Sequence, residues 1–194
     1  VPKPLKKAAV LGFGTMGRGI VIDIVRNMQI PVVVKDIPEA LEPGKAFVRK
    51  ILEGMAEKKR LKGAVDDYMK LIVTTADYGP EFRDVDIVVE AVGTLPTIWQ
   101  SMDLVTHGGI VNIVGEYWGK VELERPKGTW MINDLTIIRS FYFTIPEFHE
   151  NQQMVLEGKL DAKALATHSF PLEEVKAAYD LFQTGNSLKI MVEP

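Results

Sequence analysis

The stretch Ala8-Ala9-Val10-Leu11-Gly12-Phe13-Gly14-Thr15-Met16-Gly17 decides the fold of this chain. The apolar run over residues 6–12 ends at a glycine, which is typical of a buried parallel strand. Between Thr15 and Met28 apolar side chains recur every four positions, and this spacing predicts a helix with one buried face. Residues 30–36 are rich in β-branched side chains and predict a second strand. The chain therefore opens with a strand, a tight turn, a helix and a strand.

The three glycines of the turn have the G-x-G-x-x-G spacing of a phosphate-binding turn. Gly12 permits the tight turn, Gly14 lets a pyrophosphate approach the backbone, and Gly17 lets the helix pack closely on the sheet. The helix N-terminus adds free N–H groups and positive potential for phosphates. We predict that the whole turn binds a dinucleotide, through Gly12, Phe13, Gly14, Thr15, Met16 and Gly17.

An acidic residue, Asp36, closes the second strand 19 positions after Gly17. At this place in the motif a carboxylate accepts hydrogen bonds from the adenosine ribose. The charge of Asp36 would repel a 2′-phosphate, and no Arg follows it. The sequence therefore favours NAD(H) over NADP(H) as the cofactor.

Structural interpretations of the same residues stay open. The glycines could serve only to build a strand-to-helix turn, and Asp36 could be a surface residue in front of Pro38. We interpret Arg18 as an exposed helix charge rather than a phosphate ligand, and Lys35 as an outward-facing side chain.

The remainder of the chain continues to alternate strands with helices. Strands are predicted at 71–75, 86–92, 109–115, 120–124, 135–143 and 188–192, and helices around 47–60, 64–69, 98–105, 146–158 and 171–184. Each crossover must return over the sheet with the same hand. We therefore predict an α/β fold, a Rossmann-type doubly wound and mostly parallel sheet with helices on both faces. Residues 1–194 are expected to form a single dinucleotide-binding domain.

Composition excludes several other classes of protein. The 194 residues include no Cys, so neither a disulfide framework nor a thiolate zinc site nor a thiol nucleophile is available. The formal charge of −3 argues against a nucleic-acid surface. No apolar run approaches the ~20 residues of a membrane span, and the N-terminus does not resemble a signal peptide. We expect a cytoplasmic protein with no nucleic-acid or membrane partner.

Four stretches of the first half match one known family. They are Ala9–Ile20, Val32–Asp36, the end of a helical insertion at Glu57–Leu61, and Asp77-Tyr78 leading to Asp84–Val92. On these residues, positions 6–92 resemble the NAD-binding domain of the 3-hydroxyacyl-CoA dehydrogenases of fatty-acid oxidation. The insertion makes the resemblance specific, because a plain Rossmann unit lacks it.

A different family matches the second half. The matching stretches are Glu90–Thr94, Gly108–Gly115, Leu135–Ile138, and Thr167–Leu172 through Ala177-Ala178-Tyr179 to Lys189-Ile190. On these residues, positions 85–194 resemble the cofactor domain and C-terminal segment of the medium-chain, zinc-type alcohol dehydrogenases. This resemblance implies that Ala91, Val92 and Gly93 line the path from adenosine to nicotinamide, and that Val114 and Gly115 meet the nicotinamide ribose. It also implies a homodimer through the edge strand near Val121 and Leu123, although the charged residues of that strand, Lys120, Glu122 and Glu124, could equally protect a monomer.

The two resemblances divide the chain into halves at 1–92 and 93–194. The first half holds 15 Lys and Arg against 13 Asp and Glu, and the second holds 8 against 13. This imbalance is consistent with two origins. We interpret the chain as a chimera, engineered or natural, that joins two Rossmann halves at the fourth strand.

Neither resemblance supplies a catalytic residue. The first implies a His–Glu pair and a Ser after the fifth strand, none of which has a match, and Thr94 stands where a second acidic residue is expected. The second implies a zinc ion held by an N-terminal domain that this chain lacks. None of His107, His149 and His168 is proposed as a base. We predict no metal and an unknown catalytic site.

Three functions remain open on the sequence. The first is an NAD(H)-binding Rossmann domain without a complete catalytic site. The second is an active NAD-dependent oxidoreductase that acts on a 3-hydroxyacyl-CoA or a secondary alcohol. The third is a structural or designed fold without affinity for a ligand.

Overall fold

The computed structural model describes residues 4–120, 133–140, 142–160, 166–184 and 186–194. The chain divides into two compact units, Val1–Phe141 (unit 1) and Tyr142–Pro194 (unit 2). The expected boundary between the two halves, at residues 92 and 93, falls inside unit 1. That a single domain spans 1–194 stays a prediction.

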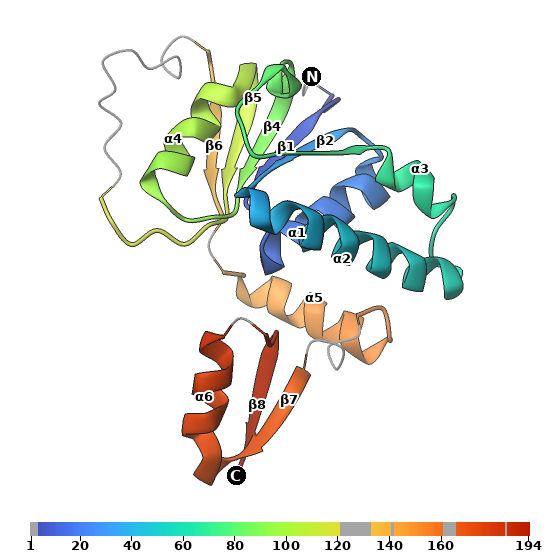
Figure 1. The fold of residues 1–194 in the computed structure, drawn as a ribbon, viewed down its shortest axis with the longest axis vertical. Helices are drawn as coiled ribbons and strands as arrows, with labels where there is room; N and C mark the ends of the chain where they lie inside the picture. Colours follow the sequence, from blue (N-terminus) through green and yellow to red (C-terminus); the bar gives the residue numbers. More distant parts are fainter. Residues whose placement is uncertain (1–3, 121–132, 141, 161–165, 185) are drawn as a thin grey trace. The chain divides into compact units, whose positions relative to one another are not determined.

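Unit 1 contains a six-stranded sheet in which every neighbouring pair of strands is parallel (Figure 1). The strand order is β3-β2-β1-β4-β5-β6, the order of a doubly wound dinucleotide-binding sheet. The strands are β1 (Ala8–Leu11), β2 (Val32–Lys35), β3 (Ile72–Thr75), β4 (Val85–Glu90), β5 (Val105–Ile113) and β6 (Thr136–Arg139). The predicted fold class is confirmed.

Register aligns the carboxyl ends of the central strands. Leu11, the last residue of β1, pairs with Lys35 of β2 on one side and with Glu90 of β4 on the other. Glu90 in turn pairs with Ile113 of β5. The segments that follow these four residues therefore leave the sheet along one edge, and this edge carries the site described below.

Helices cover both faces of the sheet in unit 1. They are α1 (Thr15–Asp23), which continues into the π-helical turn η1 (Ile24–Met28), α2 (Pro38–Glu57), α3 (Val65–Met69), the 3-10 turn η2 (Pro80–Phe82) and α4 (Leu95–Leu104). Successive strand residues point to opposite faces. Val10 accordingly joins the apolar cluster that includes Val21 of α1 and Leu52 of α2, whereas Leu11 joins the cluster that includes Ile98 of α4.

Unit 2 is a small α/β unit with a two-stranded parallel sheet (Figure 1). Its elements are α5 (Ile145–Leu156), β7 (Ala166–Pro171), the 3-10 turn η5 (Leu172–Glu174), α6 (Val175–Gln183) and β8 (Lys189–Glu193). Helix α6 packs against both strands. Ala178 is the only hydrophobic side chain that is fully buried among the described residues of unit 2.

Several element boundaries differ from the sequence prediction. The helix expected over 171–184 begins only at Val175, because residues 172–174 form a 3-10 turn. Strand β7 was not predicted, because its sequence, ATHSFP, is polar, ends in proline and pairs with β8 alone. The sixth strand is confined to Thr136–Arg139, within the expected range of 135–143. The strand expected at 120–124 lies outside the described residues beyond Lys120.

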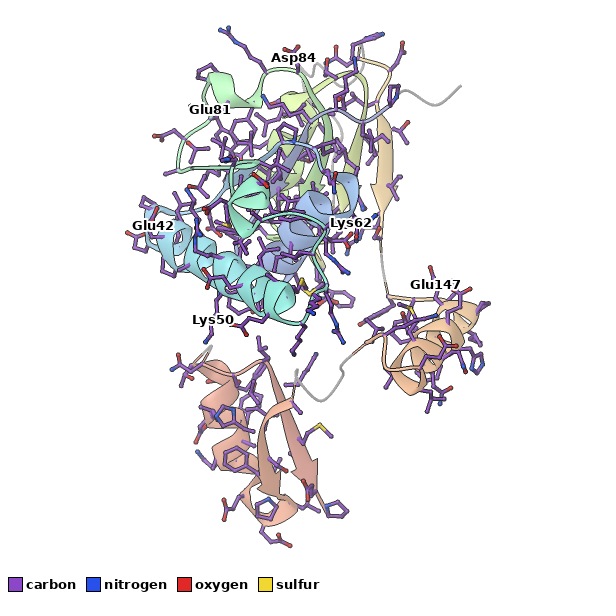
Figure 2. All side chains as sticks on the ribbon, turned by 90° about the vertical axis from the view of Figure 1, so that its right-hand side faces the viewer. Glu42, Lys50, Lys62, Glu81, Asp84 and Glu147 are labelled. Atoms are coloured by element: carbon purple, nitrogen blue, oxygen red, sulfur yellow. The ribbon has the colours of Figure 1, made fainter. Side chains whose placement is uncertain are left out.

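Helix α5 begins with a capping box. The Thr144 N–H and hydroxyl donate to Oε2 of Glu147 at 2.6 and 2.8 Å, and the Glu147 N–H donates back to the Thr144 hydroxyl (Figure 2 labels Glu147). The hydrogen bonds from Thr144, first the backbone and then the side chain, lower the pKa of Glu147 below its ordinary value.

The N-terminal turn of α5 is therefore expected to depend on pH. A carboxyl whose pKa is lower in the folded state stabilises that state above its unfolded pKa, and this contribution is lost as the pH falls through the folded value. We expect the Glu147 and Phe148 amides to exchange faster with solvent at low pH than at pH 6, after correction for intrinsic rates, as measured by NMR. In Glu147→Gln this pH dependence should disappear. An unchanged dependence in that variant would contradict the assignment.

Candidate functional site

The glycine turn joins β1 to α1 in a close approach of backbones. Gly12 has φ = 100°, and its N–H donates to the carbonyl of Lys35 at 2.8 Å. A Cβ at Gly12 would lie 3.0 Å from Cγ2 of Val92 and 3.2 Å from the carbonyl of Ala91. A Cβ at Gly17 would overlap the carbonyl oxygen of Gly12. Larger residues at Gly12 or Gly17 would push the turn away from its neighbours.

Gly14 stands at the N-cap of α1 with open space around it. Its φ of −71° is accessible to any residue, and a Cβ there would meet no atom within 4 Å. Thr15 and Met16 follow it and are exposed. The N–H groups of this first turn have no partner within the helix, so they face solvent with the positive end of the helix dipole. This arrangement suits an anion.

Asp36 is fixed beside the turn. One carboxylate oxygen accepts the N–H of Phe13, and the other accepts the N–H of Ile37 at 2.7 Å. Each carboxylate oxygen has two acceptor directions, so both oxygens can still accept a hydroxyl. Asp36 therefore ties the turn to the end of β2 and keeps an acceptor at the sheet edge.

Phe13 has a different environment from the other residues of the turn. Its side chain is fully buried, and a Cβ at Gly44 of α2 would overlap its ring. Its carbonyl accepts Nε of Arg18 at 2.8 Å. The guanidinium of Arg18 also lies over the ring of Phe47, 5.3 Å from the centroid. Only the backbone of Phe13 is available at the turn, and Arg18 is a half-buried support of the turn rather than the exposed charge that was expected.

The segments after β4 and β5 meet at the same edge. The N–H of Ala91 donates to the carbonyl of Leu11 at 2.8 Å, which ties the β4 loop to the glycine turn. The N–H groups of Val114 and Gly115 both donate to the carbonyl of Glu90 at 2.8 Å. Gly93 has φ = 83°, and a Cβ there would lie 2.6 Å from the carbonyl oxygen of Glu116.

The structure thus brings the predicted site residues to one edge of the sheet. The turn, Asp36, and the segments 91–93 and 114–115 come from four places in the sequence. Val92 is 46% exposed and so presents an apolar surface at this edge, whereas Gly115 is buried.

Glu90 is a site residue to which the sequence analysis gave no role. It is fully buried at the end of β4, and its Oε1 accepts the N–H of Val92, the N–H of Gly93 and the hydroxyl of Thr97 at 3.0, 2.8 and 2.7 Å. The signal was present in the sequence, because an acidic residue directly follows the apolar run of 87–89.

Two cavities among the described residues of unit 1 do not coincide with this edge. One, of about 480 Å³, is lined by residues that precede β2 and β3, such as Gln29 and Leu71, and so lies at the opposite edge of the sheet. The other, also about 480 Å³, lies between α1 and β4 and shares only Thr15 and Met16 with the predicted site. The candidate site is therefore defined by its backbone contacts and not by either cavity.

The histidines do not complete a catalytic site in unit 1. His107 lies near the start of β5, six residues before Ile113, and its Nε2 is 3.4 Å from Asp134. His149 and His168 belong to unit 2, where both are exposed. The catalytic residue stays unknown.

No metal centre or membrane span appears in the part of the chain that the structure describes. Those residues contain no group of three His, Asp or Glu placed to hold a metal ion. None of the described helices combines the length and apolar composition that a membrane crossing needs.

Comparison with protein families finds two matches that overlap. Residues 7–99 match the family described as "3-hydroxyacyl-CoA dehydrogenase, NAD binding domain". Residues 64–188 match the family described as "Zinc-binding dehydrogenase". The first part is also 42% identical, over 93 residues, to the fatty acid oxidation complex subunit alpha of Shewanella putrefaciens, a match that covers 47% of this chain and 13% of that protein. Both resemblances are confirmed.

Solved structures share the fold of the chain. Alcohol dehydrogenase TADH from Thermus sp. ATN1 superposes with a TM-score of 0.63 at 22% identity, covering 98% of this chain and 52% of that one. A short chain alcohol dehydrogenase from E. coli CFT073, solved with cofactor NADH, has a TM-score of 0.62 at 16% identity and covers 98% and 52%. The chain thus spans about half the length of these structures.

A zinc site of the kind that the family description names does not fit the residues present. The sequence has no Cys and only three His, and the residues that the structure describes contain no group of three His, Asp or Glu that could hold a metal ion. No step of the chemistry is therefore assigned to a metal. The match over residues 64–188 nevertheless covers more than half of the chain, and the chain belongs to the zinc-binding dehydrogenase family.

Proposed function

We propose that unit 1 binds NAD(H) along the carboxyl edge of its sheet. The observation that carries this proposal is the convergence of the glycine turn, Asp36 and the segments 91–93 and 114–115 at one edge. The order β3-β2-β1-β4-β5-β6 reverses direction between β1 and β4, and dinucleotides bind at such a switch point. The pyrophosphate would rest on the first turn of α1 beside Gly14.

The preference for NAD(H) over NADP(H) rests on the charges around Asp36. Its carboxylate would repel a 2′-phosphate on the ribose that it binds. Two cations close in sequence to Asp36 and to the glycine turn have other contacts: Nζ of Lys35 lies over the ring of Tyr78, 5.0 Å from the centroid, and Nε of Arg18 donates to the carbonyl of Phe13.

NAD(H), when bound, would supply hydride transfer. Within unit 1 the described side chains position the cofactor, but no His stands at the carboxyl edge to move the substrate proton. We infer a cofactor-binding unit with an incomplete catalytic site. An active oxidoreductase is the second candidate, favoured by the family match. NAD-linked turnover of a 3-hydroxyacyl-CoA or a secondary alcohol by the folded chain would establish that second candidate.

We further infer that the chain is a chimera joined near the end of β4. The two family matches overlap over residues 64–99, a range that includes β4. A junction there leaves the crossover before β4 and the crossover after it intact, and β4 stays in register with both neighbours. The absence of Cys is compatible with the cytoplasmic location that we propose.

Asp36→Ala tests the cofactor assignment. The substitution removes the ribose acceptor and the bond to the Phe13 N–H, so we expect NADH affinity to fall by roughly 10- to 100-fold, as for loss of one hydrogen bond to a charged group. NADPH affinity should fall less, because the repulsive charge is gone. Isothermal titration with NADH and with NADPH measures both affinities, and their ratio should shift toward NADPH in the variant.

The control is Glu42→Ala, which removes an exposed carboxylate of α2 in the same unit (Figure 2 labels Glu42). Its affinity for NADH should equal that of the unmodified chain. If Asp36→Ala binds NADH as tightly as this control, Asp36 does not contact the cofactor.

A further inference from the structure

The carboxylate of Glu90 is the most deeply buried acidic side chain among the described residues of unit 1, with no exposed surface against 5% for Asp86. Its two oxygens have unequal environments. Oε1 accepts three donors, from Val92, Gly93 and Thr97. Oε2 has no hydrogen-bond partner among the residues that the structure describes. A buried acceptor without a donor is unfavourable for folding, so stability alone does not explain why Glu90 stands here.

Oε2 lies between the two loops of the sheet edge. A Cβ at Gly115 would overlap both Oε2 of Glu90 and the backbone nitrogen of Gly93. The main-chain carbonyl of Glu90 meanwhile accepts the N–H groups of Val114 and Gly115. One residue therefore holds the β4 loop through its side chain and the β5 loop through its backbone.

Glu90 also fixes the start of α4. The hydroxyl of Thr97 donates to Oε1 and takes part in the capping box that Thr94 forms at the N-terminus of this helix. Removal of the carboxylate would leave the N–H groups of Val92 and Gly93 without their acceptor and release the Thr97 hydroxyl. The β4 loop would then lose its fixed shape.

Topology indicates which part of a dinucleotide these loops would meet. In the proposed binding mode Asp36, after β2, binds the adenosine ribose, and the N-terminus of α1, after β1, binds the pyrophosphate. In the strand order, β4 and β5 lie on the other side of β1 from β2. A dinucleotide that crosses the turn therefore places its nicotinamide riboside over the two loops that Glu90 holds.

We propose that Glu90 is a positioning residue for the nicotinamide riboside half of the bound dinucleotide, which it controls through segments 91–93 and 114–115 without touching it. The proposal rests on the proposed binding of NAD(H) by unit 1. It predicts that a change at Glu90 affects ligands that contain the nicotinamide riboside and spares ligands that lack it.

The test compares NADH with ADP, which keeps the adenosine and the two phosphates of NADH and lacks its nicotinamide riboside. In Glu90→Gln the side-chain volume is kept, but a neutral amide is a weaker acceptor for the loop N–H groups and puts a donor where Oε2 stood. We expect the NADH dissociation constant to rise by about tenfold and that of ADP to change by less than about twofold, as measured by isothermal titration. Thr97→Val, which removes one donor to Oε1, should give the same selectivity with a smaller effect. Glu42→Gln, an exposed Glu in the same unit, should change neither constant.

Each result decides one claim. If the unmodified chain binds neither NADH nor ADP, the proposed function fails. If that chain binds NADH no more tightly than ADP, or if Glu90→Gln weakens both ligands alike or neither, cofactor binding stands and the role of Glu90 is wrong. If circular dichroism shows that Glu90→Gln does not fold, Thr97→Val tests the role of Glu90 instead, again by comparing the change in the NADH dissociation constant with the change in that of ADP.

Discussion

Gly17→Ala is expected to destabilise unit 1 by about 3 kcal/mol or more, the upper part of the range for overpacking. The new Cβ would overlap the carbonyl oxygen of Gly12 and lie 2.9 Å from its carbonyl carbon. Both are backbone atoms of a turn that β1 and the β4 loop already hold, so neither can rotate away as a side chain would. Helix α1 must then separate from the sheet.

Tryptophan fluorescence during urea unfolding measures this effect in unit 1 selectively, because all three Trp precede residue 142. Gly19→Ala is the matched control two residues later in α1. A Cβ there meets no atom within 4 Å, so this change should stabilise the helix by about 0.5–1 kcal/mol. Equal effects of the two substitutions would contradict the close approach of α1 to the turn.

Gly14→Val is expected to weaken NADH binding strongly while leaving unit 1 folded. A Cβ at Gly14 points into open space, so the folded chain accepts the side chain. The branched side chain would then occupy the place that the pyrophosphate needs beside the first N–H groups of α1. We expect the affinity for NADH to fall by about 30-fold or more, which corresponds to about 2 kcal/mol.

A thermal shift assay shows both halves of this prediction. The unmodified chain should melt at a higher temperature with NADH present, because a ligand that binds only the folded state stabilises it by about 2.7 kcal/mol at 100 times its dissociation constant. Gly14→Val should melt normally without NADH, and the same NADH concentration should stabilise it by no more than about 0.9 kcal/mol. Gly54→Val, which also has an unobstructed Cβ but lies in α2, should keep the full shift. If NADH raised the melting temperature of Gly14→Val by the full amount, the proposal that the pyrophosphate binds at this turn would be wrong.

The sequence predicted the sheet of unit 1 well because the relevant signals are local. Apolar runs such as 87–89 lie in buried strands, and the glycines at 12 and 17 lie where the backbones of β1, α1 and the β4 loop come close together. Register then follows from parallel pairing, which brings Asp36 and segment 91–93 to one edge. Each of these inferences needs only a short stretch of chain.

Contacts between distant side chains could not be predicted in the same way. The stacking of Lys35 on Tyr78 joins residues 43 positions apart, and nothing local to either indicates it. Arg18 was expected to be exposed because helix periodicity says nothing of the Phe13 carbonyl beside it. Glu90 ends its strand as an ordinary acidic residue would, and only the fold shows that three donors converge on one of its oxygens.

The most direct test of the central claim is amide chemical-shift mapping of the chain by NMR as NADH is added. Binding at the proposed site predicts that the largest shifts fall on residues 12–17, Asp36, 91–93 and 114–115, and that the remainder of unit 1 changes little. Saturating NADH that leaves these amides unshifted, or that shifts residues at the opposite edge around Gln29 and Leu71 instead, would contradict the claim.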